Sequence, residues 1–155
     1  MQTIEELLRA HPFFDDFDPA TVALLAGCAT SVRFAPGEVI FREAEPADAF
    51  YVLQSGRVAL QVHHPAGGAL VTSTVEHDEV LGWSWLVPPY RWTADAVAVA
   101  ETNAVRFAAG CLRGTCADDP AVGYVFLRKI AQVLAHRLAS ANRRLLDLYG
   151  GGDRP

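Results

Sequence analysis

Long apolar runs are missing from this chain of 155 residues. No stretch approaches the roughly 18 uninterrupted apolar residues that a membrane-spanning helix needs. The opening residues 1–6 contain no basic side chain, whereas a secretory signal begins with positive charge. These absences argue against a membrane protein and against a secreted one. We therefore expect a cytoplasmic protein without membrane contact.

Cysteine is scarce as well, with three residues, Cys28, Cys111 and Cys116, and no Cys-x-x-Cys pair. Small proteins that depend on disulfides or structural zinc usually carry an even number of cysteines at regular spacings. A chain of this length with 51% hydrophobic residues can bury a core of its own. We interpret the three cysteines as small, buried or half-buried apolar residues, and we predict neither a disulfide framework nor a zinc site.

Motifs for catalysis and for metal binding are also missing. The sequence has no Gly-x-Ser-x-Gly elbow and no Gly-x-x-x-x-Gly-Lys phosphate loop. His63 and His64 are neighbours on an expected strand and so point to opposite faces, while His77 lies at an expected turn. We interpret these as surface histidines. The sequence predicts a protein that is not an enzyme and that holds no metal or cofactor.

Positive charge is scarce outside one segment. The net charge is −5, yet residues 120–149 hold five basic residues and one acidic residue, which leaves −9 for the remainder. Nucleic-acid phosphates require a positive surface. The basic residues form no unbroken run and recur at helical spacing, which is typical of a solvated helix face. We therefore predict no direct DNA binding.

The apolar residues that are present divide the chain into three segments. Residues 1–28 show helical spacing broken by two prolines, which predicts two short helices. Residues 29–108 contain short alternating or β-branched runs between turn signals, a pattern typical of a sandwich, roll or barrel. Residues 109–150 are expected to form C-terminal helices, the longer of which starts at Asp119-Pro120. We expect a single domain.

The long helix carries a regular apolar repeat. Apolar residues spaced alternately by three and four form the a/d seam of a coiled coil, and a second stripe of Phe126, Ile130 and Val133 lies on an adjacent face. Two stripes need two partners, so we predict that the seam joins a homodimer; alternatively, both stripes belong to the chain's own core. The seam comprises Tyr124, Leu127, Ala131, Leu134, Leu138, Ala141, Leu145 and Leu148.

Residues 33–58, RFAPGEVIFREAEPADAFYVLQSGRV, resemble the first half of a cyclic nucleotide-binding domain. The opening helix with His11-Pro12 and the closing helix from Asp119-Pro120 also match, so the resemblance covers about the whole chain. It is strongest to the sensor half of the bacterial catabolite-activator and Fnr (Crp/Fnr) superfamily. The resemblance implies a mainly β fold, a β-roll or jelly roll, with short N-terminal helices and a long C-terminal helix. The chain departs from the family at Ala44, where glycine is usual.

The resemblance also locates the segment that binds the cyclic phosphate in the family, here called the cassette, at residues 81–96. Family members carry Gly-Glu there, and about ten residues later Arg-Ser/Thr-Ala. In this chain Trp83 takes the Glu position and Trp92 the Arg position, and Arg91 can substitute only if the strand register shifts by one. On the long helix, Asn142 is the candidate for a polar ligand contact. The candidate pocket residues are Gly82, Trp83, Ser84, Trp85, Arg91, Trp92, Thr93, Ala94 and Asn142.

Three interpretations of the cassette remain open at this point: aromatic side chains fill it, it takes a less polar ligand, or it binds a cyclic nucleotide. The first leads to a non-catalytic, stand-alone regulatory homodimer that acts through an unknown protein partner. The alternative is that the chain is the ligand-sensing part of a Crp/Fnr-type transcriptional regulator. In that case the helix-turn-helix that follows the long helix in such regulators is missing from the sequence. The Gly-rich end, residues 150–155, favours a natural terminus and thus the first hypothesis.

Overall fold

Two four-stranded antiparallel sheets form a roll in the computed structural model, which describes residues 2–150; the tail interpreted above as a natural terminus lies almost entirely outside the described residues. Both sheets combine strands from distant parts of the sequence, as in a jelly roll. The predicted class, mainly β with flanking helices, is confirmed. One sheet has the order β1 (Ala29–Phe34), β8 (Thr102–Ala108), β3 (Ala49–Ser55) and β6 (Val80–Leu81); the other has β2 (Val39–Phe41), β7 (Asp95–Ala98), β4 (Arg57–His63) and β5 (Ala69–Glu76).

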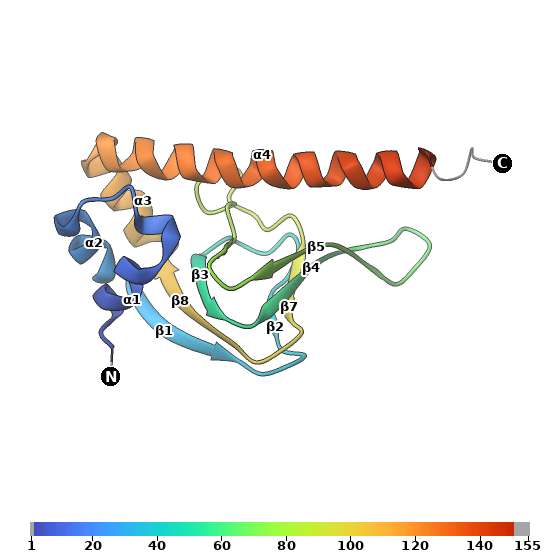
Figure 1. Ribbon diagram of the computed structural model, residues 1–155, viewed down its shortest axis with the longest axis horizontal. Helices are drawn as coiled ribbons and strands as arrows, with labels where there is room; N and C mark the ends of the chain where they lie inside the picture. Colours follow the sequence, from blue (N-terminus) through green and yellow to red (C-terminus); the bar gives the residue numbers. More distant parts are fainter. Residues whose placement is uncertain (1, 151–155) are drawn as a thin grey trace.

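The short helices gather at one end of the roll, and the long helix α4 runs along its side (Figure 1). Side chains cap two of the short helices at their N-termini. Thr3 accepts a hydrogen bond from the Glu6 amide, and Asp18 accepts one from the Thr21 amide at 2.8 Å. The helices are α1 (Ile4–Ala10), the 3-10 helix η1 (Pro12–Phe14), α2 (Pro19–Ala26), α3 (Ala109–Asp118) and α4 (Pro120–Gly150).

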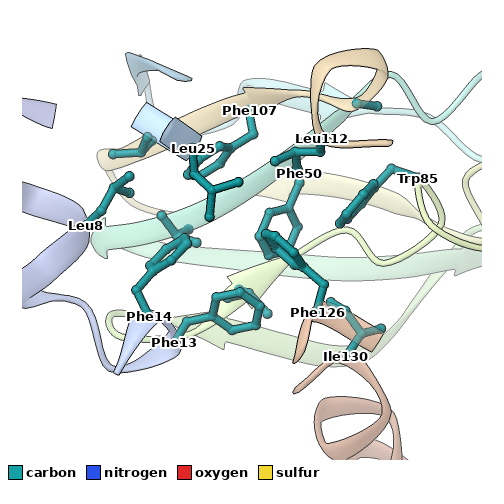
Figure 2. Close-up of a cluster of buried hydrophobic side chains, with 14 of the residues drawn as sticks. Leu8, Phe13, Phe14, Leu25, Phe50, Trp85, Phe107, Leu112, Phe126 and Ile130 are labelled. Atoms are coloured by element: carbon teal, nitrogen blue, oxygen red, sulfur yellow. The ribbon is translucent and has the colours of Figure 1, made fainter. Parts of the chain in front are cut away.

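An aromatic core joins the helical end to the roll (Figure 2). Phe126 of α4 lies within 6.2 Å, centroid to centroid, of Phe50 on β3 and within 5.5 Å of Trp85 in the cassette. Phe13 and Phe17 cover the same ring from the N-terminal side. Burial of such rings is the main force that holds α4 to the roll. The first half of α4 is therefore anchored by the second stripe predicted from the sequence.

The structure contradicts the prediction about cysteine. Cys28 precedes β1 and Cys111 lies in the first turn of α3, and the two form a disulfide with a Cα–Cα distance of 5.7 Å. They are 83 residues apart in the sequence, so no local spacing indicates the pair. Cys111 is also exposed, whereas the sequence analysis placed it among small apolar residues. Cys116 remains a free thiol.

Candidate functional site

The cassette connects β6 to β7 and is held by backbone pairing with the bend at residues 44–47. The Ala44 amide donates to the Trp92 carbonyl at 2.8 Å, and the Trp92 amide donates to the Glu45 carbonyl at 3.0 Å. The Ala47 amide donates to the Tyr90 carbonyl at 2.8 Å. Arg91 forms an antiparallel bridge with Pro46, so the side chains of residues 91 and 92 point to opposite sides.

Because of this alternation, Arg91 and Trp92 face opposite ways. Arg91 is exposed, and its Nη1 donates to the Ala44 carbonyl at 3.2 Å. Trp92 is buried and points into the roll. The register shift that Arg91 needs in order to substitute for the missing arginine does not occur. The structure thus leaves the cassette without a basic side chain of its own on its inner side.

The Trp92 indole fills the space between the cassette and β2. It stacks on Phe41 with ring centroids 3.7 Å apart and planes 7° from parallel. It also covers Gly82, where an added Cβ would lie 2.8 Å from the indole edge. A side chain at position 82 is therefore excluded by the ring as well as by the φ of +89°. The Trp92 indole can take this position only because residue 82 is glycine.

A surface hollow of about 340 Å³ lies against Phe41 and Trp92 on the side of Val39, Arg42 and Asp48, but little space remains on the side of the stack that faces Gly82 and Ser84. A cavity of about 30 Å³ is left, close to the share of one water molecule in the liquid. Ligand pockets usually measure about 300 to 1,000 Å³. We call this small cavity the cassette remnant. It is lined by Phe41, Leu60, Gly82, Trp83, Ser84, Trp92, Thr93, Ala94 and Arg137.

Besides Arg91, two of the predicted pocket residues lie elsewhere. Trp85 is fully buried in the aromatic core, against Phe50 and Phe126, and does not line the cassette cavity. Its indole Nε1 has no hydrogen-bond partner among the described residues. Asn142 is exposed on α4 and lines none of the cavities described here. Six of the predicted residues do line the small cassette cavity: Gly82, Trp83, Ser84, Trp92, Thr93 and Ala94.

Arg137 of α4 is a site residue that the sequence analysis missed. It lines the cassette remnant, and its Nη2 donates to the Val80 carbonyl at 3.0 Å. Burial lowers the pKa of its guanidinium, while the negative charge of Glu79 raises it. An arginine has five N–H donors, so most of them remain free. Its position four residues after Val133, in line with the second apolar stripe of α4, is the signal for it in the sequence.

A polar groove adjoins Arg137 between β5 and α4. The groove has a volume of about 330 Å³ and is lined by Thr72, Ser73, Thr74, Glu76, Glu79, His136, Arg137, Ser140, Ala141 and Arg144. Arg144 Nη1 donates to the Thr72 carbonyl and closes one end. Two guanidinium groups and two carboxylates thus face the same space. Such a groove can bind a polar ligand whose acidic group meets the guanidiniums while its hydrogen-bond donors meet the carboxylates.

Asp95 lies directly after the cassette and is also absent from the predicted set. Its buried carboxylate accepts a hydrogen bond from the Glu43 amide at 2.7 Å and lies 3.1 Å from His63 Nε2. The pair ties the start of β7 to β4 and to the 44–47 bend. It does not line the cassette remnant, so its role is to position the strand ends.

The predicted seam of α4 is mostly uncovered in the single chain. Leu127, Leu138, Leu145 and Leu148 are 54%, 63%, 53% and 75% exposed, and Tyr124, Ala131 and Ala141 are exposed as well. Leu134 differs because it is half-buried against the core. By contrast, Phe126 and Ile130 of the second stripe are fully buried. α4 therefore packs on the roll with one face and presents an apolar seam on another.

Two further features bear on function. Within the described residues, no three histidine, cysteine or acidic side chains lie close enough together to hold a metal ion. No helix in residues 2–150 is long and apolar enough to cross a membrane.

Comparison with known proteins gives a consistent result. A model of the cyclic nucleotide-binding domain family matches residues 31–119. The "CRP-like cAMP-activated global transcriptional regulator" of Mycobacterium tuberculosis is 30% identical over 145 residues. That match covers 94% of this chain and 63% of the relative, so the chain spans less than two thirds of the relative's length.

Solved structures of bacterial proteins share the fold. A candidate cyclic nucleotide-binding protein of Geobacter metallireducens GS-15 is 27% identical with a TM-score of 0.77, covering 89% of this chain and 99% of that one. The N-terminal domain of a transcriptional regulator from Streptomyces coelicolor A3(2) is 29% identical with a TM-score of 0.67, covering 90% and 95%.

Proposed function

The chain belongs to the cyclic nucleotide-binding domain family, and on that premise we propose that it is a non-catalytic regulatory module of Crp/Fnr type that does not take up cyclic AMP or cyclic GMP. The placement of Trp92 carries this proposal. Its indole occupies the inner side of the cassette, stacked on Phe41, and leaves about 30 Å³. A cyclic nucleotide is far larger than this space.

The lost polar contacts act in the same direction. A hydrogen bond to a charged group contributes roughly 1.5 to 3 kcal/mol, so the absence of both the acidic and the basic cassette contacts removes roughly 3 to 6 kcal/mol. That corresponds to a loss of about 100- to 10,000-fold in affinity. A site with a dissociation constant of about 1 micromolar in a relative therefore weakens to roughly 0.1 to 10 millimolar.

We further propose that the module is a homodimer joined along the α4 seam and that it acts in the cytoplasm through a protein partner. The exposed leucines of the seam support the dimer, because a row of apolar residues at heptad spacing is the usual pairing surface of coiled coils. The negative charge of the chain outside α4 argues for a protein partner rather than DNA. The likeness to transcriptional regulators supports the cytoplasmic location.

Isothermal titration of the full chain with cyclic AMP and cyclic GMP tests the ligand part of the proposal. We expect no binding with a dissociation constant of about 10 micromolar or tighter, and such binding would overturn it. The variant that restores both family residues, Trp83→Glu with Trp92→Arg, is expected to bind cyclic AMP more tightly than the wild type. Arg91→Ala is the matched control, and we expect it to change nothing because Arg91 points outward.

A second candidate function is the sensing of an anionic ligand in the polar groove between β5 and α4. Arg137 and Arg144 line this groove, and each engages a single backbone carbonyl, which leaves most of their N–H donors free. A thermal-shift screen with small anionic metabolites tests it. A stabilising compound whose effect disappears in Arg144→Met would favour this function over a ligand-free module.

A further inference from the structure

Helix α3 connects the disulfide, the cassette and the long helix. At its start, Cys111 is bonded to Cys28, which lies between α2 and β1. Two residues later, Arg113 Nη1 donates to the Trp85 carbonyl of the cassette at 2.8 Å, and its guanidinium lies 4.8 Å from the centroid of the Tyr90 ring. At its end, Cys116 packs against Gly123 of α4.

The two cysteines differ in exposure. Cys111 is exposed, whereas Cys28 is half-buried at the helical end of the roll. Thiol–disulfide exchange requires an attacking thiolate to reach a sulfur in line with the bond, so an exposed sulfur is the point of attack. The third cysteine does not compete, because Cys116 is half-buried and burial raises the pKa of its thiol.

We propose that the Cys28–Cys111 disulfide is a reversible exchange site for a cytoplasmic dithiol, and that its reduction loosens the cassette through Arg113. The inference rests on the cytoplasmic location proposed above, since disulfides of cytoplasmic proteins are usually transient and redox-sensing. One thiolate of the dithiol attacks Cys111 Sγ, the Sγ–Sγ bond breaks, and Cys28 leaves as a thiolate that takes a proton from water. The second thiolate of the dithiol then displaces Cys111, so the protein gains two electrons and the dithiol becomes a disulfide.

Reduction is expected to shift α3 without unfolding the molecule. Leu112 is fully buried in the aromatic core, and the Ala109 amide donates to the Asp48 carbonyl at 3.0 Å, so α3 keeps other attachments. What it loses is the covalent bond at its first turn, two residues before Arg113. Movement there changes the contacts of Arg113 with Trp85 and Tyr90, which lie in the same loop as Trp92.

Native-state reduction of the full chain by dithiothreitol, followed by alkylation and mass spectrometry, tests the site. We expect Cys28 and Cys111 to become alkylated while circular dichroism stays that of the folded protein. Amide exchange in residues 84–92 is expected to increase about tenfold on reduction. A disulfide that is reduced only when the protein unfolds, or a reduction that leaves exchange in residues 84–92 unchanged, would overturn the proposal.

Two variants separate the coupling from general loosening. In Arg113→Met the cassette has already lost its link to α3, so exchange in residues 84–92 should be raised before reduction and should rise no further afterwards. Cys116→Ala should behave as the wild type. Sedimentation of the oxidised and the reduced protein is measured in parallel: a monomer in both states contradicts the proposed dimer but leaves the exchange site intact.

Discussion

At the scale of single residues, Trp92 determines what the cassette can hold. It occupies the inner side of the loop because backbone pairing with residues 44–47 directs alternate side chains inward. Trp92→Ala should lower the free energy of unfolding by about 3 to 5 kcal/mol, the usual cost of a large buried aromatic side chain, as measured by chemical denaturation. Trp83→Ala is the control, since Trp83 is only half-buried and should cost less. A loss no larger for Trp92 than for Trp83 would contradict the stacked geometry.

Ala44 is the second informative residue, because it has a φ of +72° where the family usually carries glycine. An L-residue in this left-handed region is strained by roughly 1 to 2 kcal/mol, whereas glycine is not. Glycine loses more backbone entropy on folding, which offsets part of that gain. Ala44→Gly should therefore raise the free energy of unfolding by about 0.5 to 1 kcal/mol. Ala47→Gly, at a buried neighbour without positive φ, should lower it; equal effects of the two changes would refute the assignment of strain.

His11 makes stability depend on pH. Its Nε2–H donates to the Leu53 carbonyl at 3.1 Å and its Nδ1 accepts from the Phe13 amide at 3.2 Å, so the neutral ring fits this place. Burial lowers the pKa of His11 below its ordinary value of 6.5, although the Leu53 carbonyl and Asp78 raise it in part.

The unfolded chain therefore takes up the proton first as the pH falls. The contribution of His11 to stability is complete above pH 6.5 and is lost below it, at no more than about 1.4 kcal/mol per pH unit. Urea unfolding at several pH values should show this slope in the wild type and a weaker one in His11→Gln. Parallel curves for the two proteins would contradict the prediction.

At the scale of elements, one face of α4 packs on the roll and another is exposed to solvent in the single chain. Phe126 and Ile130 bury one face in the aromatic core, while the seam on the other stays exposed over its length except at Leu134. Each leucine buried in a paired seam contributes roughly 1.5 to 3 kcal/mol. The four exposed seam leucines of each chain therefore give roughly 12 to 24 kcal/mol across two chains, against an estimated cost of association of about 4 to 15 kcal/mol. A parallel homodimer is thus expected at micromolar concentration.

Leu138→Asp combined with Leu145→Asp should give a folded monomer, because both residues are exposed in the single chain and the changes place like charges within the seam. Leu134 is unsuitable for this test because it contacts the chain's own core. Leu146→Asp is the matched control, since Leu146 is 71% exposed but lies off the seam. Sedimentation decides the question: a wild type that is monomeric at about 100 micromolar would assign the seam to another partner.

At the scale of the whole molecule, the disulfide joins the N-terminal helical end to the helix that leads into α4. It links residues 83 positions apart, and closing such a loop restricts the unfolded chain. Cys111→Ser should lower the free energy of unfolding by about 2 to 4 kcal/mol under non-reducing conditions. Cys116→Ser, which removes the free thiol, should have a smaller effect. Equal stability of the oxidised wild type and Cys111→Ser would show that the bond does not form in solution.

The sequence by itself determined the features that depend on local periodicity. The 3-4 spacing of apolar residues predicted α4 and both its stripes, the alternating runs predicted the strands, and Asp119-Pro120 marked the start of the long helix. The motif in residues 33–58 indicated the family. These features depend on neighbours within a few positions, where spacing alone decides which side chains share a face.

Only the tertiary structure decided the features that join distant segments. Cys28 meets Cys111 because α3 returns to the start of β1, so an odd cysteine count was a misleading signal. Trp92 rather than Arg91 faces inward because the cassette pairs with residues 44–47, a register that no local pattern specifies. Arg137 reaches the cassette because α4 crosses the roll at that point. Each depends on the packing of whole elements, which brings together residues that the sequence keeps far apart.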